Sequence, residues 1–262
     1  MKHLSYFKRL CLIGAGFYIF FFPAAFAQPL HIAVAANFVG PMKIIAQNFE
    51  RESRHTIMIS SGSTGKFYAQ IKNGAPFDLF FSADAETVAK LEAENETVPG
   101  SRFTYAIGTL ALWSSKEGFV DPNGEILKNT SLRHLAIASP KLAPYGKAAQ
   151  ETLEKLNLWG ALQGKMVQGE NIAQTFQFVS TGNAELGFVA LSQIYRDGSI
   201  QTGSAWIVPD SYHSPIRQDA AILNRAKDNA AAAEFMTWFK RQEVKDIIRS
   251  FGYAFDQEKT GQ

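Results

Sequence analysis

The sequence predicts an α/β protein with two lobes, each a mostly parallel sheet flanked by helices. Short β-branched or aromatic runs alternate with helical patterns, an order typical of parallel sheets. Two long extended segments, 103–113 and 211–223, lie about one domain's length apart, as a chain that crosses twice between two domains requires. With 262 residues, 46% of them hydrophobic, the chain can bury cores of this size.

The individual elements follow from the hydrophobic pattern. Buried strands are expected at 30–35, 56–60, 78–83, 135–138 and 186–190, where short apolar runs are rich in β-branched or aromatic residues. Helices are expected at 41–52, 66–73, 85–94, 147–156, 173–180 and 230–249, where apolar residues recur every three to four positions.

The first 27 residues predict a secretory signal peptide. A basic start precedes the apolar residues 12–22, and the small residues Ala25 and Ala27 occupy the two cleavage positions. The apolar run is much shorter than the roughly 20 residues that span a bilayer. We therefore expect cleavage near Ala27, a mature chain that begins near Gln28, and a periplasmic location.

Composition argues against several classes of function. The single cysteine, Cys11, lies in the leader, so the mature chain has no thiol chemistry and no disulfide. The leader's three basic residues exceed the whole chain's formal charge of +2, which leaves the mature chain near −1 by the same count. Nucleic acid is not an expected partner, because a binder would show a clustered basic face.

Enzyme and metal motifs are also missing. The histidines have no metal-ligand spacing, so no metal site is expected. The stretch 60–67 resembles a phosphate loop, but Ser60 stands where that motif needs glycine and Phe67 where it needs a hydroxyl residue. No Gly-x-Ser-x-Gly elbow is present, because Gly62 and Gly65 are only three residues apart.

Four places share one design, in which a strand ends in small polar residues that open a helix. They are residues 35–37, 61–65, 143–146 and 169–172. A helix N-terminus leaves backbone N–H groups unpaired and carries partial positive charge, so several that converge can hold an anion. Asn37, Ser63, Thr64 and Tyr145 add side-chain donors. Each of these positions alone is more often an ordinary helix cap than a ligand contact. Their shared place after strands of α/β sheets favours a ligand site.

With these junctions in view, the sequence resembles the periplasmic molybdate-binding proteins of ABC importers, a family of type II periplasmic binding proteins. The resemblance spans the mature chain. It rests on AANF at 35–38, SGSTGK at 61–66, NGAPFDLFFSAD at 73–84, APYG at 143–146 and LGFVA at 186–190. Of the family's branches, this chain is similar to the one with asparagine in the first loop and tyrosine in the third.

The resemblance implies a bilobal fold whose cleft encloses a tetrahedral oxyanion, molybdate or tungstate, with no cofactor and no fixed cation. Carried over by position, the contacts are Asn37 and the backbone of Ala36, the hydroxyl of Thr64 with help from Ser63, Tyr145, and the backbone N–H of Ile172. It also implies lobe I at 28–107, lobe II at 108–212 and a return segment of lobe I at 213–262.

The resemblance further implies a non-enzymatic carrier that docks on the membrane permease of an ABC importer. We expect a monomer, because carriers of this kind open and close by hinge motion. Two alternatives remain open on the residues alone. One is a binding protein for another tetrahedral oxyanion such as sulfate, and the other is an exported enzyme on the same scaffold.

Overall fold

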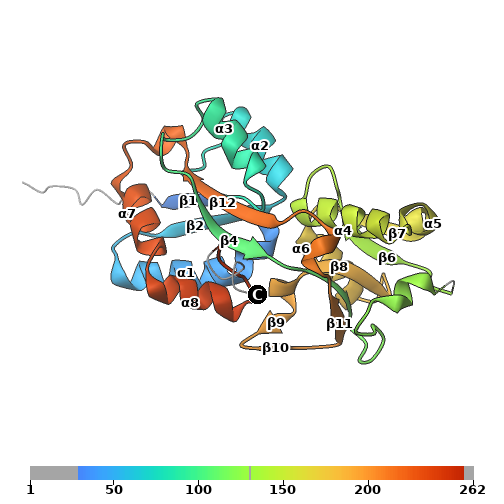
Figure 1. The fold of residues 1–262 in the computed structure, drawn as a ribbon. Helices are drawn as coiled ribbons and strands as arrows, with labels where there is room; N and C mark the ends of the chain where they lie inside the picture. The colour runs from blue at the N-terminus through green and yellow to red at the C-terminus, as the bar shows by residue number, and fades with distance from the viewer. Residues whose placement is uncertain (1–28, 130, 257–262) are drawn as a thin grey trace, which may run out of the picture.

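The computed structural model describes residues 29–129 and 131–256, which form two five-stranded sheets and a two-stranded ribbon. Figure 1 shows two bodies, each a sheet with helices packed on it, joined by extended chain (Figure 1). We call the body that contains β1 the first lobe and the body that contains β8 the second lobe. This architecture confirms the predicted α/β class. The predicted signal peptide, 1–27, lies outside the described residues.

The first lobe is built on the sheet β2-β1-β3-β12-β4. Its strands are β1 (Leu30–Ala35), β2 (Ile57–Gly62), β3 (Leu79–Phe81), β4 (Phe103–Gly108) and β12 (Ile216–Ile222). Its helices are α1 (Val39–Glu52), α2 (Thr64–Lys72), α3 (Glu86–Ala93), α7 (Ala230–Phe239) and α8 (Gln242–Ser250). Helices α1, α7 and α8 share one core with the sheet, while α2 and α3 cover its other face (Figure 1).

The second lobe is built on the sheet β11-β5-β8-β6-β7. Its strands are β5 (Leu110–Ser114), β6 (Leu135–Ala138), β7 (Met166–Gly169), β8 (Leu186–Ala190) and β11 (Ser204–Ile207), with the ribbon β9 (Tyr195–Arg196) and β10 (Ser199–Ile200) beside it. Helices α4 (Pro144–Lys155) and α5 (Trp159–Leu162) pack on one face and α6 (Ile172–Ser180) on the other. Short 3₁₀ turns are η1 (Ala36–Phe38), η2 (Glu125–Lys128), η3 (Gln163–Lys165), η4 (Leu191–Gln193), η5 (Asp210–Tyr212) and η6 (Asn224–Ala226).

Both sheets are mixed, whereas the sequence predicted mostly parallel ones. Strands β2, β1 and β3 are mutually parallel, as are β8, β6 and β7. The antiparallel pairs all involve the strands next to the crossovers, 109 and 208–215. The carboxyl ends of β3 and β4 face the second lobe, and β12 enters the first lobe from that side, so β12 runs antiparallel to both. In the same way β5 enters the second lobe from the first and runs antiparallel to β8.

The cores follow the two-residue period of the strands. In β1, Leu30, Ile32 and Val34 join the core shared with α1, α7 and α8, while Ala33 joins the core under α2 and α3. Phenylalanine fills much of the larger core, where Phe38 and Phe81 are fully buried. Each such side chain contributes roughly 1.5–3 kcal/mol through burial. These phenylalanines therefore serve to pack the first lobe.

Several helix boundaries differ from the predicted ones. Helix α2 begins at Thr64 rather than Lys66, and α4 begins at Pro144 rather than Lys147, since proline is favoured in the first turn. The predicted helix 230–249 is two helices, α7 and α8, broken at 240–241. Strand β7 was not predicted. Together these corrections place predicted site residues inside first helical turns.

Candidate functional site

Four strand-to-helix junctions, two from each lobe, meet at one small pocket, which we call the inner pocket. In the first lobe β1 leads into η1 and β2 into α2, and in the second lobe the chain after β6 enters α4 and the chain after β7 enters α6. The lining residues are Ala35, Ala36, Asn37, Gly62, Ser63, Thr64, Ala83, Ala143, Pro144, Tyr145, Asn171 and Ile172. All six predicted site residues, Ala36, Asn37, Ser63, Thr64, Tyr145 and Ile172, are therefore brought together.

The inner pocket is compact and its lining is uncharged. Its volume is about 10 Å³, which is room for about one water molecule. None of the described residues that line it is acidic or basic. The first residues of α2 and α6 and the first two of α4 line it, so three helix N-termini contribute partial positive charge. The electrostatics suit an anion held by neutral donors.

Asn37 lies in the first junction and is almost fully buried. Its amide Nδ2 donates to Gln218 Oε1 at 2.7 Å and to Tyr253 Oη at 3.0 Å. Its amide oxygen Oδ1 is buried without a hydrogen-bond partner. Its backbone carbonyl accepts from Tyr253 Oη and from Ser192 Oγ of the second lobe.

Ser63 and Thr64 form the second junction, and both are 2% exposed. The hydroxyl of Ser63 is buried with no partner in the protein. Thr64 Oγ1 accepts from the Ala83 N–H at 3.0 Å, which leaves the hydroxyl hydrogen of Thr64 available for donation. A buried hydroxyl without a partner is costly, so its presence in this pocket points to a ligand that accepts from it.

Tyr145 lies in the first turn of α4, and its hydroxyl accepts from Gln218 Nε2 at 3.2 Å. Gly146 makes this placement possible, because a Cβ there would lie 2.3 Å from the carbonyl oxygen of Ala138. Burial raises the pKa of Tyr145 well above that of an ordinary phenol. The Tyr145 hydroxyl therefore stays protonated at neutral pH and can donate.

The fourth junction presents backbone N–H groups. Asn171 caps α6, and its side-chain oxygen accepts from the N–H groups of Ala173 and Gln174. The cap does not use the N–H of Ile172, the first residue of the helix, which lines the inner pocket. The carbonyl of Ile172 accepts from Gln193 Nε2 at 3.1 Å, which fixes this peptide against η4.

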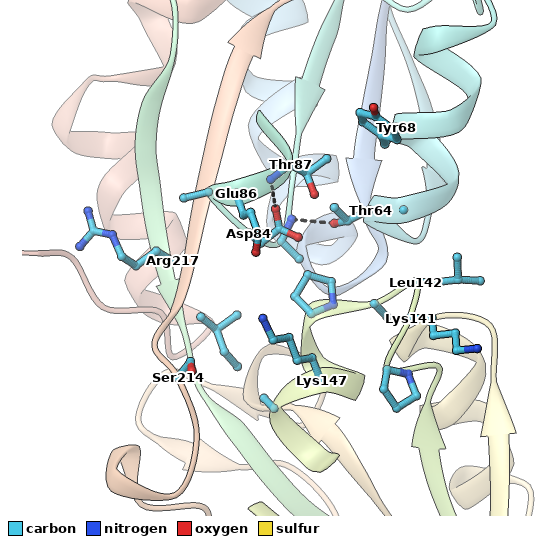
Figure 2. A pocket seen from close by; sticks show the side chains of 18 of the residues that line it. Thr64, Tyr68, Asp84, Glu86, Thr87, Lys141, Leu142, Lys147, Ser214 and Arg217 are labelled. Atoms are coloured by element: carbon cyan, nitrogen blue, oxygen red, sulfur yellow. Dashed lines mark hydrogen bonds between the residues drawn. The ribbon is translucent and has the colours of Figure 1, made fainter. Parts of the chain in front are cut away.

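A larger outer cleft of about 480 Å³ adjoins the inner pocket, with which it shares Thr64, Ala83, Ala143 and Pro144. Figure 2 shows Asp84, Glu86 and Arg217 on the first lobe and Lys141 and Lys147 on the second lobe around this cleft (Figure 2). Both signs of charge occur in the outer cleft, in contrast to the inner pocket. Burial raises the pKa of the Asp84 carboxyl, which accepts from the Thr87 N–H in the first turn of α3.

The two lobes touch around the inner pocket. The Gly65 N–H donates to the Leu142 carbonyl at 2.9 Å, and Lys66 Nζ pairs with Glu170 Oε2 at 2.6 Å. Lys66 is thus partnered across the cleft, although its side chain is half exposed. Both contacts join the start of α2 to the second lobe.

The sequence did not reveal the residues behind the site. Gln218 and Tyr253 are buried and hydrogen-bonded to Asn37, and Gln218 also contacts Tyr145. Buried Tyr105 in turn contacts Gln218. All three lie far from the four junctions in the chain. One signal was available, since Gln218 is a polar residue within the extended segment 211–223. An amide in a buried strand needs hydrogen-bond partners.

Two absences complete the description of residues 29–129 and 131–256. No group of three or more His, Cys, Asp or Glu side chains in these ranges could hold a metal ion. Within the same ranges, none of the helices has the length and apolar character needed to cross a bilayer.

The fold and the interlobe site are those of a solute-binding protein. Residues 30–254 match the family described as bacterial extracellular solute-binding protein. Among curated proteins, the chain is 54% identical over 231 residues to the molybdate-binding protein ModA of Azotobacter vinelandii, covering 88% of this chain and 92% of the relative. It is 46% identical over 233 residues to ModA of Rhodobacter capsulatus, covering 88% and 90%.

The fold comparison agrees. The solved periplasmic molybdate-binding protein of Azotobacter vinelandii superposes with a TM-score of 0.84 at 42% identity, covering 87% of this chain and all of that chain. The sulfate-binding protein SubI of Mycobacterium tuberculosis H37Rv shares the fold, with a TM-score of 0.71 at 11% identity, covering 87% and 86%. The chain belongs to the bacterial extracellular solute-binding proteins, in the family of the ModA proteins.

Proposed function

We propose that this protein captures molybdate, and tungstate with it, in the periplasm and delivers the oxyanion to the membrane permease of an ABC importer. The ModA relatives, at 54% and 46% identity over most of the chain, support this cargo. They carry the names of binding proteins, which supports a carrier rather than an enzyme.

One observation carries the proposal from the structure. Ser63 Oγ is buried without a partner in an uncharged pocket at which three helix N-termini converge. A dianion seated there would accept from Ser63 and from the free hydroxyl hydrogen of Thr64. The backbone N–H groups of Ala36 and Ile172 and the side chains of Asn37 and Tyr145 complete the proposed set.

Selectivity follows from the donor chemistry. A shell made of donors suits a fully deprotonated tetrahedral oxyanion. A protonated phosphate would present its own hydrogen to a site with few acceptors, and that hydrogen would lose its partner. Molybdate and tungstate have nearly equal size and are larger than sulfate, so a shell spaced for them holds sulfate loosely. In this proposal the spacing and the chemistry of the donors together select the cargo.

The arrangement of the lobes supports capture by closure. We place lobe I at 28–107 and 213–262 and lobe II at 108–212, with the crossovers as the hinge. Hinge closure would bring the donors of both lobes onto one anion and exclude water from it. A monomer suffices, because both lobes belong to one chain. Export would follow signal cleavage near Ala27.

A calorimetric titration of the purified mature chain with molybdate, tungstate, sulfate and phosphate tests the proposal. We expect tight one-to-one binding of molybdate and tungstate and much weaker binding of the other two. Binding of sulfate in preference to molybdate would assign a different cargo. No binding of any oxyanion would contradict the proposed function.

A further inference from the structure

The turn η4 follows β8 directly and is held in place at the crossover and within the second lobe. The Leu191 N–H donates to the Thr109 carbonyl at 2.9 Å, where the chain crosses between the lobes. Gln193 Oε1 accepts from the Ala190 N–H at 2.9 Å, and Gln193 Nε2 donates to the Ile172 carbonyl at 3.1 Å. The neighbours settle the orientation of this amide, because one is a donor and the other an acceptor. Turn η4 is therefore fixed relative to the fourth junction.

The middle residue of η4, Ser192, reaches the opposite lobe. Its half-buried hydroxyl donates to the Asn37 carbonyl of the first junction at 2.9 Å. A carbonyl carries no hydrogen, so Ser192 is the donor. Tyr253 of the first lobe donates to the same carbonyl at 2.8 Å. Of these two hydrogen bonds, only the one from Ser192 joins the lobes.

Ser192 and Gln193 thus connect two junctions that belong to opposite lobes. Asn37 and Ile172 both line the inner pocket, whereas Ser192 and Gln193 do not. The two connecting residues are adjacent in the chain, and consecutive Cα atoms are only about 3.8 Å apart. The connection is therefore short, and it contacts the junctions at their backbone carbonyls rather than the space that an anion would fill.

A connection of this kind bears on the size of the anion that fits. Donors within one lobe are spaced by the fold of that lobe, whereas donors on opposite lobes are spaced by how closely the lobes meet. A hydrogen bond has a narrow range of donor–acceptor distances, so the Ser192 bond restricts the separation of the first and fourth junctions. The backbone bond from Gly65 to Leu142 restricts the second and third junctions in the same way.

We propose that Ser192 is a positioning residue that, through η4, sets the separation between the first and fourth junctions and so favours the larger oxyanions over sulfate. The inference rests on the oxyanion site proposed above and deepens it by naming a residue that governs size selectivity. Ser192 acts without contacting the anion, because it holds the Asn37 peptide at a fixed place relative to Ile172. Without the Ser192 hydroxyl, the closed lobes can settle at the separation that each anion prefers.

The test is Ser192→Ala, titrated with molybdate, tungstate and sulfate by calorimetry. Loss of one hydrogen bond between the lobes should weaken molybdate and tungstate binding by about fivefold each. Sulfate binding should weaken by less than about twofold, because a better fit to the smaller anion offsets part of the lost bond. The preference for molybdate over sulfate should therefore fall, while the preference between molybdate and tungstate should stay the same.

Thermal melting and a matched control separate positioning from folding. In Ser192→Ala the Asn37 carbonyl keeps its hydrogen bond from Tyr253, so the melting temperature of the anion-free protein should change little. Ser250→Ala is the control, because the Ser250 hydroxyl is also half-buried and donates to a backbone carbonyl, that of Ile247 at 2.8 Å, but within one helix. Ser250→Ala should bind all three anions like the natural protein.

Unchanged molybdate affinity in Ser192→Ala, or equal losses for molybdate and sulfate, would overturn the proposal. A second measurement repeats the substitution in Gln193→Glu, whose carboxylate can accept from Ala190 but cannot donate to Ile172. There η4 is released from the fourth junction, so Ser192→Ala should weaken molybdate binding by less than about twofold. A loss as large as in the natural background would also overturn the proposal. Failure of the natural protein to bind any oxyanion contradicts the proposed function instead.

Discussion

Gly65 of the first lobe and Leu142 of the second lobe are joined by a backbone hydrogen bond of 2.9 Å across the cleft. A Cβ at Gly65 would lie 3.2 Å from both the Cα and the carbonyl oxygen of Leu142. That distance is tighter than ordinary contact, so a side chain at residue 65 would require Leu142 to shift by a few tenths of an ångström. A substitution at Gly65 therefore tests whether this close approach of the two lobes is needed for anion binding.

Gly65→Ala should strengthen α2 and weaken anion binding at once. Alanine is favoured over glycine in a helix by about 1 kcal/mol, so the melting temperature should rise. The added methyl group presses on Leu142 in the closed form, so affinity should fall several-fold, by about 1 kcal/mol. Gly160→Ala is the matched control, because a Cβ at this helical glycine has no neighbour within 4 Å. Equal affinity of Gly65→Ala and the natural protein would contradict this account.

Ser63→Ala should weaken molybdate binding about tenfold without loss of stability. The Ser63 hydroxyl has no partner in the protein, so its removal breaks no internal hydrogen bond. Calorimetry and thermal melting measure the two effects. Thr97→Val is the control, because Thr97 Oγ1 is also buried and unpartnered but lies outside the inner pocket. If both variants bind like the natural protein, Ser63 is not a ligand contact.

Thr64→Val should reduce affinity and stability together, whereas Thr64→Ser should preserve both to within about threefold in affinity. Valine cannot accept from the Ala83 N–H, and leaving that group unpaired costs about 1–3 kcal/mol of unfolding free energy. Valine also cannot donate to the anion. Urea unfolding and calorimetry separate the two losses, and a stable Thr64→Val protein with unchanged affinity would refute both roles.

Glu170→Gln should speed release of the anion by less than about fivefold, since exposed ion pairs contribute about 0–1 kcal/mol. The Lys66–Glu170 pair bridges the lobes, with side chains 51% and 40% exposed. The difference from the natural protein should shrink as salt is added. Stopped-flow dissociation measures it. Glu125→Gln, which breaks an exposed pair with Lys128 inside the second lobe, should leave release unchanged.

Asp84→Asn should alter the pH dependence of stability. Burial raises the pKa of Asp84, so the folded state binds this proton more tightly than the unfolded state does. The natural protein therefore loses the associated stability as pH rises through the raised pKa, and keeps it fully below the ordinary carboxyl value near 4. Asparagine can still accept from Thr87 and does not titrate in this range. The gain in melting temperature from Asp84→Asn should be larger at neutral pH than at about pH 3, and a pH-independent difference would contradict the prediction.

The sequence predicted the junctions better than the sheets. Strands such as Leu30–Ala35 and Leu186–Ala190 were predicted with their observed bounds, because short apolar runs specify buried strands locally. Strand direction is not local. Whether β12 runs with or against β3 depends on where the chain re-enters the lobe, and no residue pattern within 216–222 encodes that.

For the candidate site too, residues placed by a local pattern could be predicted and residues placed by long-range contacts could not. Ser63, Thr64 and Ile172 stand at helix starts, so a pattern of a few residues located them. Gln218 meets Asn37 only after the chain has crossed to the second lobe and back, a separation of 181 residues. Its role follows from three-dimensional proximity alone. The sequence showed only that an amide stood in a strand that would be buried.

The lining of the inner pocket has a consequence for the environment in which the protein works. The lining includes no acid, no base and no histidine, and burial raises the pKa of Tyr145, its one phenol. No group in the lining gains or loses a proton when the surroundings turn mildly acidic or alkaline. The affinity of this lining for the anion should therefore change little over a range of pH in which a site built on histidine would lose or gain charge.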